Sequence, residues 1–267
     1  MSRVTGALAD IKLPRPMRPL VLRTFARIAG IRVDEAEFDV RAYPSVNAFF
    51  VRRLRAGLRD FGSHPRAVVS PVDGIVGAFG AIEDDTALQA KGLPYKVNEL
   101  LGEAATPWRD GHFITIYLAP RHYHRIHTPM PARVVRARHV PGRLFPVNTP
   151  AVAHVPRLFA INERLIAILD TAAGPLGLAA VGAFNVGRIS AAFDRAWGGR
   201  DGDAITNRGQ HPPPERVYDP PIELGAGAEL MAFHLGSTVV LVLPAGLTPV
   251  PDLATGMEIQ AGRVLAR

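Results

Sequence analysis

Short apolar segments rich in β-branched residues, each bounded by glycine or proline, follow one another from Pro65 to the C-terminus. Segments of this kind are typical of β-strands. The predicted strands are Ala67–Val69, Ile75–Phe79, Phe113–Leu118, Ala132–Val140, Leu165–Leu169, Leu176–Ala183, Glu229–His234 and Thr238–Leu243. The polar, proline-rich stretch Trp197–Pro221 is predicted to be a long surface loop. Few helices fit between the strands, which favours an α+β fold with a mainly antiparallel β core over a doubly wound sheet.

Residues 1–62 differ from the rest of the chain and are predicted to carry amphipathic helices. The first helix is expected from Pro19 to Gly30, with proline in its first turn and glycine at its end. Val21, Phe25 and Ile28 would share one of its faces. Its pattern suits both a helix lying in the headgroup region of a membrane and a helix packed on the protein core.

A second helix is predicted to begin after Ser45 and to run towards Leu58. It would combine an apolar stripe with a basic face. These are formed by Val46, Phe49, Phe50 and Leu54, and by Arg52, Arg53 and Arg55.

The charge of the chain points to an anionic partner. The formal net charge is +7, and nearly all basic residues are arginines. Such a balance suits nucleic acid or an acidic membrane face. The chain has no cysteine, which excludes disulfides and thiolate chemistry. The longest uncharged stretches contain glycine or proline and are shorter than a bilayer span, so we expect a chain that rests on a membrane without crossing it.

Three short stretches can carry chemistry, although each also has a purely structural interpretation. Asp73 lies in Ser70-Pro71-Val72-Asp73-Gly74, where it is compatible with an ordinary turn residue. His122, His124 and His127 lie within six positions, and proton transfer suits them better than metal binding. Ser237 follows Gly236 between two apolar segments, where a simple β-bulge is also possible.

Together these stretches supply the parts for self-cleavage. A serine hydroxyl needs a base, and the base works better when a carboxylate orients it; Ser237, His127 and Asp73 supply these three groups. Attack by Ser237 on the Gly236 carbonyl would give an ester, and elimination followed by hydrolysis would leave a pyruvoyl group. A carbonyl conjugated to an amide is an electron sink, as pyridoxal phosphate is in other enzymes.

These stretches make the chain resemble phosphatidylserine decarboxylases. That family has an Asp in a Ser-Pro-x-Asp-Gly-like turn, a Tyr-His-Arg-x-His-x-Pro segment and a Leu-Gly-Ser-Thr site, and all three occur here in the same order. The resemblance runs from about Phe49 to the C-terminus. Weaker echoes are Asn47-Ala48-Phe49-Phe50, Lys91-Gly92-Leu93-Pro94-Tyr95, Leu100-Leu101-Gly102, Asn162-Glu163-Arg164, Val181-Gly182-Ala183, Asn185-Val186-Gly187 and Gly262-Arg263-Val264-Leu265-Ala266.

The resemblance implies residue roles. Asp73, His127 and Ser237 match the self-processing triad, and His124 matches the histidine assigned to decarboxylation. Cleavage between Gly236 and Ser237 would divide the catalytic domain, residues 63–267, and leave chains 1–236 and 237–267 as a heterodimer, with further homo-oligomerisation possible. The pyruvoyl cofactor derived from Ser237 would form a Schiff base with the substrate amine, and no metal is required.

The resemblance also implies a substrate and a location. The enzyme would convert phosphatidylserine to phosphatidylethanolamine and CO2 in phospholipid biosynthesis. It would be a peripheral protein on the cytoplasmic side of the cell membrane, docked by its N-terminal helices on an anionic surface, with no nucleic-acid partner. Two departures stand out: His122 replaces the usual Asp before the Tyr-His pair, and Arg188 stands where a small residue is common and is predicted to contact the lipid phosphate.

Three alternatives stay open. The first is a related pyruvoyl decarboxylase acting on a different serine-headed lipid. The second is a non-enzymatic basic β protein that binds a membrane surface or nucleic acid. The third is a metal-dependent hydrolase that uses the histidine cluster.

Overall fold

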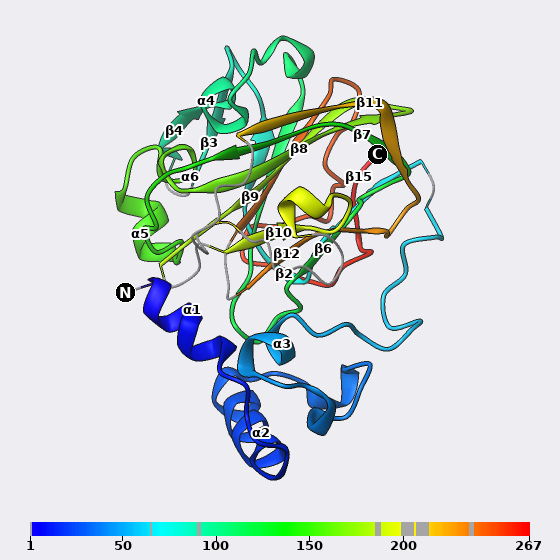
Figure 1. Cartoon of the computed structure of the whole chain (residues 1–267). Coiled ribbons are helices and arrows are strands. Elements are labelled where there is room, and N and C mark those ends of the chain that lie inside the picture. The colour runs from blue at the N-terminus through cyan, green and yellow to red at the C-terminus, as the bar shows by residue number, and fades with distance from the viewer. Residues whose placement is uncertain are drawn as a thin grey trace.

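An eight-stranded antiparallel sheet forms the centre of the molecule (Figure 1). The protein is represented by a computed structural model that describes residues 2–64, 66–89, 92–184, 188–198, 206, 214–234 and 238–267. In spatial order the strands are β11 (Glu215–Leu224), β7 (Ala132–Val140), β8 (Arg164–Thr171), β9 (Gly174–Val181), β13 (Thr238–Leu243), β5 (His112–Tyr117), β2 (Gly74–Ala81) and β14 (Glu258–Ile259). The predicted α+β fold with an antiparallel core is confirmed.

Both faces of this sheet are covered. A three-stranded sheet of β10 (Ile189–Ala191), β12 (Glu229–Phe233) and β6 (Arg125–His127) contributes to the hydrophobic core on one face. The other face packs against α4 (Val97–Leu101) and α6 (Leu158–Ile161). Every residue of β13 is buried, because alternate side chains along this strand enter the two cores.

Shorter elements complete the β part of the chain. β1 pairs with β15 and β3 pairs with β4, and α5 lies between β7 and β8 in the sequence. The short elements are β1 (Val68–Val69), β15 (Val264–Ala266), β3 (Thr86–Leu88), β4 (Pro94–Lys96), α5 (Thr149–His154) and the 3₁₀ turns Thr106–Trp108 and Arg195–Trp197.

The N-terminal helices lie together at one end of the molecule, below the sheet in Figure 1. They are α1 (Ser2–Asp10), α2 (Arg18–Ala29) and α3 (Val46–Phe50), joined through 3₁₀ turns at Arg15–Met17, Val33–Glu35 and Val40–Ala42. The prediction of α2 is confirmed, and Gly30 ends it in the left-handed conformation (φ 72°) that glycine readily adopts. On the face predicted to carry Val21, Phe25 and Ile28, the first two are half-buried and Ile28 is 82% exposed, while α2 packs on the protein through Leu22 and Ala26.

The predicted second helix is much shorter than expected. α3 ends at Phe50 instead of running towards Leu58. The chain then runs beside the segment after α2, with the amide of Arg55 donating to the carbonyl of Glu35 at 2.9 Å and that of Glu37 to Arg53 at 2.9 Å. Pairing with a neighbouring segment therefore overrides the local helical pattern. The predicted division of the chain at residue 62 stays a prediction.

All eight predicted strands occur, with shifted ends in most cases. The prediction of a loop over Trp197–Pro221 is wrong at its end, because β11 begins at Glu215. This strand is at the edge of the sheet and its register shifts between Val217 and Ile222, so its two prolines are tolerated there. Residues 199–205 and 207–213 of that stretch lie outside the described residues. Among the described helices, none has the length and apolar composition needed to cross a bilayer.

Candidate active site

The register of three neighbouring strands brings the candidate residues to one end of the central sheet. Tyr117 at the end of β5 pairs with Ile75 of β2 on one side and with Thr238 of β13 on the other. Asp73 lies two residues before Ile75, and the histidine segment follows β5. A Cβ atom at Gly74 would lie 2.7 Å from the Tyr117 carbonyl oxygen, so glycine is needed beside Asp73. Gly236 and Ser237 lie outside the described residues, but the chain enters β13 directly after them.

Asp73 is buried and held by an arginine that the sequence interpretation missed. The guanidinium of Arg59 donates from Nε and Nη2 to the two carboxylate oxygens, at 2.8 and 2.6 Å. The amide of Ala261 donates to the same carboxylate at 2.9 Å. Arg59 also binds Glu35, so the N-terminal segment is tied to Asp73. An arginine among many in a basic segment gives no sequence signal for this contact.

His127 is oriented by a backbone carbonyl. Its Nδ1 lies 2.7 Å from the Gly227 carbonyl oxygen, which can only accept, so Nδ1 carries the proton. Nε2 therefore accepts from the hydroxyl of Tyr123 at 2.9 Å. Burial lowers the pKa of His127 and raises that of Tyr123, so the imidazole is neutral and the phenol protonated near pH 7. The Gly227 carbonyl therefore orients His127, the role that the sequence suggested for Asp73. Among the described residues Asp73 makes no hydrogen bond to His127, and it acts on this histidine through its charge.

His124 has one nitrogen with no partner. Its Nδ1 donates to the His122 carbonyl oxygen at 2.9 Å, and its ring lies against Phe50 with the ring centres 4.0 Å apart. The side chain is completely buried, and Nε2 has no hydrogen-bond partner in the described part of the protein. Burial holds the pKa of His124 well below its usual value. His124 therefore presents an unprotonated nitrogen in an apolar setting, and the stacked Phe50 was not anticipated.

His122 faces a different partner. Its Nδ1 accepts from the amide of Ala119 at 2.9 Å, and its Nε2 donates to Glu258 at 2.9 Å. β6 begins at Arg125, so of the three histidines only His127 lies in a strand. The described residues contain no cluster of three His, Asp or Glu side chains arranged to hold a metal ion.

The chain just before the predicted cleavage point is fixed on both sides. The ring of His234 lies between Asn47, which donates to Nδ1 at 3.2 Å, and Ser190, 3.0 Å from Nε2. Asn47 also donates to Asp10, whose other oxygen pairs with Arg188 at 2.7 Å. The prediction that Arg188 contacts a lipid phosphate stays a prediction, and its guanidinium pairs with the N-terminal helix α1.

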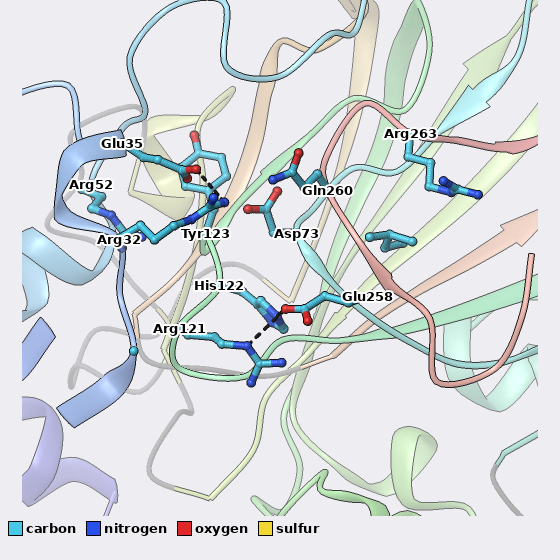
Figure 2. Close-up of a pocket in the computed structure, with 12 residues that line it drawn as sticks. Arg32, Glu35, Arg52, Asp73, Arg121, His122, Tyr123, Glu258, Gln260 and Arg263 are labelled. Carbon is cyan, nitrogen blue, oxygen red and sulfur yellow. Dashed lines mark hydrogen bonds and ion pairs between the residues drawn. The ribbon is translucent and has the colours of Figure 1, made fainter. Parts of the chain in front are cut away.

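A cavity of about 650 Å³ opens between the N-terminal segment and the sheet (Figure 2). Asp73, His122 and Tyr123 line it from the β part of the chain, and Arg52 and Glu35 line it from the N-terminal segment. The volume lies in the range of small-ligand pockets. The sequence interpretation counted Arg52 among the basic residues of a predicted helix and did not predict it in this cavity.

Comparison with known proteins agrees with these features. The family model described as phosphatidylserine decarboxylase matches residues 46–267. A phosphatidylserine decarboxylase proenzyme from Anaeromyxobacter sp. (strain K) is 41% identical to the chain, covering 99% of it and 93% of the relative. A proenzyme of the same name from Halorhodospira halophila is 42% identical, covering 100% and 89%, and one from Nitrosococcus oceani is 43% identical, covering 84% and 73%. The chain therefore belongs to the phosphatidylserine decarboxylase family.

Proposed function

We propose that this protein cleaves itself between Gly236 and Ser237 and then, as a pyruvoyl-dependent enzyme, converts phosphatidylserine to phosphatidylethanolamine and CO2. The observation that carries the proposal is that the histidine segment is hydrogen-bonded to the chain beside both other motifs. The amide of His127 donates to the carbonyl of Pro71, two residues before Asp73, at 2.9 Å, and the carbonyl of His124 accepts from the amide of Phe233, three residues before Gly236, at 3.0 Å. Family membership supports the same reaction.

Self-cleavage needs a nucleophile, a base and an unhindered carbonyl. The Ser237 hydroxyl attacks the Gly236 carbonyl carbon and gives up its proton, while the peptide nitrogen leaves as an amine and an ester forms. The proton reaches Nε2 of His127, which its bond with the Tyr123 hydroxyl already marks as the accepting nitrogen. The charge of Asp73 favours the imidazolium that results. Loss of the α-proton then breaks the ester, and water converts the new dehydroalanine to pyruvoyl and ammonia.

The proposed pyruvoyl group and the buried His124 together suit a reaction that releases CO2. The pyruvoyl group supplies a conjugated carbonyl that takes up the electron pair left when CO2 departs. His124 contributes a buried, unprotonated Nε2 beside Phe50. We assign this nitrogen to accept a proton from the substrate ammonium and to return it to the α-carbon after CO2 has left. An imidazolium with a lowered pKa is a strong proton donor, which suits the second half of this role.

The N-terminal helices supply a surface that suits docking on a membrane. Ten large apolar side chains of the described chain are markedly exposed, and six of them lie between residues 8 and 38. These six are Leu8, Ile11, Met17, Leu20, Ile28 and Phe38. Exposed Arg15, Arg23 and Arg27 lie among them. Apolar burial together with attraction to anionic lipids is the usual basis of such docking. This surface supports the proposal of a peripheral enzyme on the cytoplasmic face of the cell membrane, where anionic lipids give a negative surface potential.

An intact-mass measurement on the purified protein tests the proposal. We expect two chains, of residues 1–236 and 237–267, with the 31-residue chain blocked at its first residue by a carbonyl group. The same preparation should convert phosphatidylserine in detergent micelles. A single unbroken chain that still released CO2 from the lipid would contradict the proposal.

A further inference from the structure

Arg52 is a buried guanidinium with unused donors. Its side chain is only 2% exposed, and neither Nε nor Nη1 has a hydrogen-bond partner within the described residues. The nearest compensating contact is the face of Phe49, 5.5 Å from the guanidinium carbon. A cation–π contact offsets only part of the cost of removing a guanidinium from water. Burial lowers the pKa of Arg52, the direction expected when desolvation is not matched by a bound anion.

The other charges around the cavity of Figure 2 are already paired. Arg32 pairs with Glu35, Arg121 with Glu258, and Arg263 with Asp252. Asp73 is taken by Arg59, which also binds Glu35. Among the described residues that line this cavity, Arg52 is thus the one arginine without a carboxylate partner. Its free charge faces a space large enough for a small polar ligand.

Arg52 is also close to the proposed reaction centre. Phe50, two residues earlier, stacks on His124, and the charge of Arg52 contributes to the low pKa of that histidine. Tyr123, which binds His127, lines the same cavity. The cavity that Arg52 lines therefore adjoins the candidate active site, because Asp73 and Tyr123 line it as well.

The chemistry of decarboxylation decides which anion Arg52 should hold. A carboxylate loses its charge as CO2 leaves, so a guanidinium paired with it would stabilise the ground state more than the transition state. A phosphodiester keeps its charge throughout, so pairing with it costs no rate. Resting on the function proposed above, we propose that Arg52 binds the phosphodiester of the serine phospholipid headgroup in this cavity.

This assignment predicts a particular split of kinetic constants. Arg52→Gln should be self-cleaved normally and keep kcat within about 3-fold, because the contact is equally strong in ground and transition states. KM should rise by about 10- to 100-fold, the range for one hydrogen bond to a charged group. Arg52→Lys should recover part of this loss. Arg133→Gln, which removes an equal charge from a surface pair with Asp170, is the matched control and should behave as wild type.

Stability separates a binding role from a structural one. If Arg52 serves a ligand, replacing an unpaired buried charge should leave the melting temperature unchanged or higher. A lower melting temperature together with incomplete self-cleavage would show that Arg52 braces the fold, and would overturn the proposal. A fall in kcat at unchanged KM would do the same, because it would place Arg52 at the reacting atoms.

Three soluble probes identify the anion without relying on turnover. Calorimetry should show that wild type binds glycerophosphoethanolamine, which has the phosphodiester but no carboxylate, and that Arg52→Gln weakens this binding by the same factor as KM. L-Serine binding should be unaffected by the substitution. If Arg52→Gln lost only L-serine binding, the ligand of Arg52 would be the carboxylate and not the phosphodiester. If inorganic phosphate bound as tightly as glycerophosphoethanolamine, the site would bind free phosphate and would not be specific for the lipid headgroup. Failure of the proposed function would appear separately, as wild type that neither cleaves nor decarboxylates.

Discussion

The central sheet buries its apolar side chains, whereas the N-terminal segment exposes several of them. In the sheet, every residue of β13 is buried between two cores. In the first 38 residues, six large apolar side chains face outward, and Ile28 is 82% exposed. Exposed apolar side chains gathered in one region often mark an interaction site. The central sheet fixes the geometry of the candidate site, and the N-terminal segment is the part that we propose contacts a membrane surface.

The two regions nevertheless meet at the candidate site. The inner side of the N-terminal segment places Phe50 on His124, Arg59 on Asp73 and Asn47 on His234. Arg53 pairs with Glu229 of β12, which also binds Arg125 of β6. The segment thus has an outer face suited to lipid and an inner face that completes the site. Substitutions in the two regions should therefore affect different properties of the protein.

Removal of the Ser237 hydroxyl should have the largest effect. Ser237→Ala has no nucleophile, so we expect one uncleaved chain and no measurable decarboxylation. Intact mass and CO2 release measure the two outcomes, and Ser63→Ala, an exposed serine, is the control. Cleavage of Ser237→Ala at the same bond would show that another group attacks Gly236.

Replacement of His124 should separate the two reactions. His124→Ala should still cleave itself but lose about 10²- to 10⁴-fold in kcat, the usual contribution of a proton-transfer group. Single-turnover decarboxylation of the cleaved protein gives the measurement, with the exposed His64→Ala as control. If His124→Ala stayed uncleaved, the roles of His124 and His127 would have to be exchanged.

Charges placed on the outer face of α2 should weaken membrane binding alone. Leu20→Asp combined with Ile28→Asp removes two exposed apolar side chains, each worth about 1.5 kcal/mol or more when buried in lipid. We expect co-sedimentation with anionic vesicles to fall at least about 10-fold, while activity on short-chain substrate in solution stays near wild type. Leu88→Asp, 44% exposed on β3, is the matched control. An equal loss of vesicle binding in the double variant and in Leu88→Asp would show that the N-terminal segment has no particular role in membrane binding.

The buried histidines predict a pH dependence of stability. Burial lowers the pKa of His122, His124 and His127 in the folded protein, so the unfolded chain binds more protons once the pH falls below about 6.5. The free energy of unfolding should therefore be flat above that value and decrease below it, by about 1.4 kcal/mol per pH unit for each histidine. Urea denaturation at several pH values measures the slope, and His124→Gln should reduce it. A stability that rose on acidification would contradict the burial of these rings.

Local sequence pattern was informative where a segment's own composition decides its structure. Six strands of the central sheet follow from β-branched runs, and helix α2 follows from the Pro19 and Gly30 boundaries. These strands are β2, β5, β7, β8, β9 and β13. The sequence pattern gave the wrong secondary structure where contacts with a neighbouring segment determine it. The backbones of Arg53 and Arg55 are hydrogen-bonded to the segment after α2, which ends the predicted helix early. The prolines of β11 predicted a loop, but a strand at the edge of the sheet tolerates them.

The same distinction applies to the site. Asp73 and the histidines were recognisable because their motifs are short and ordered along the chain. Their partners Arg59, Tyr123 and Gly227 lie 14, 4 and 100 residues away from the groups that they contact. Only the strand register and the packing of the N-terminal segment bring these groups together.

The central position of β13 has a consequence for the mature enzyme. Cleavage between Gly236 and Ser237 would cut the backbone just before β13 and leave this strand hydrogen-bonded along its length to β9 and β5. The same short fragment also supplies β14 and β15, which pair with β2 and β1. Separating the two pieces would therefore require unfolding the central sheet around β13, and we expect them to copurify under native conditions.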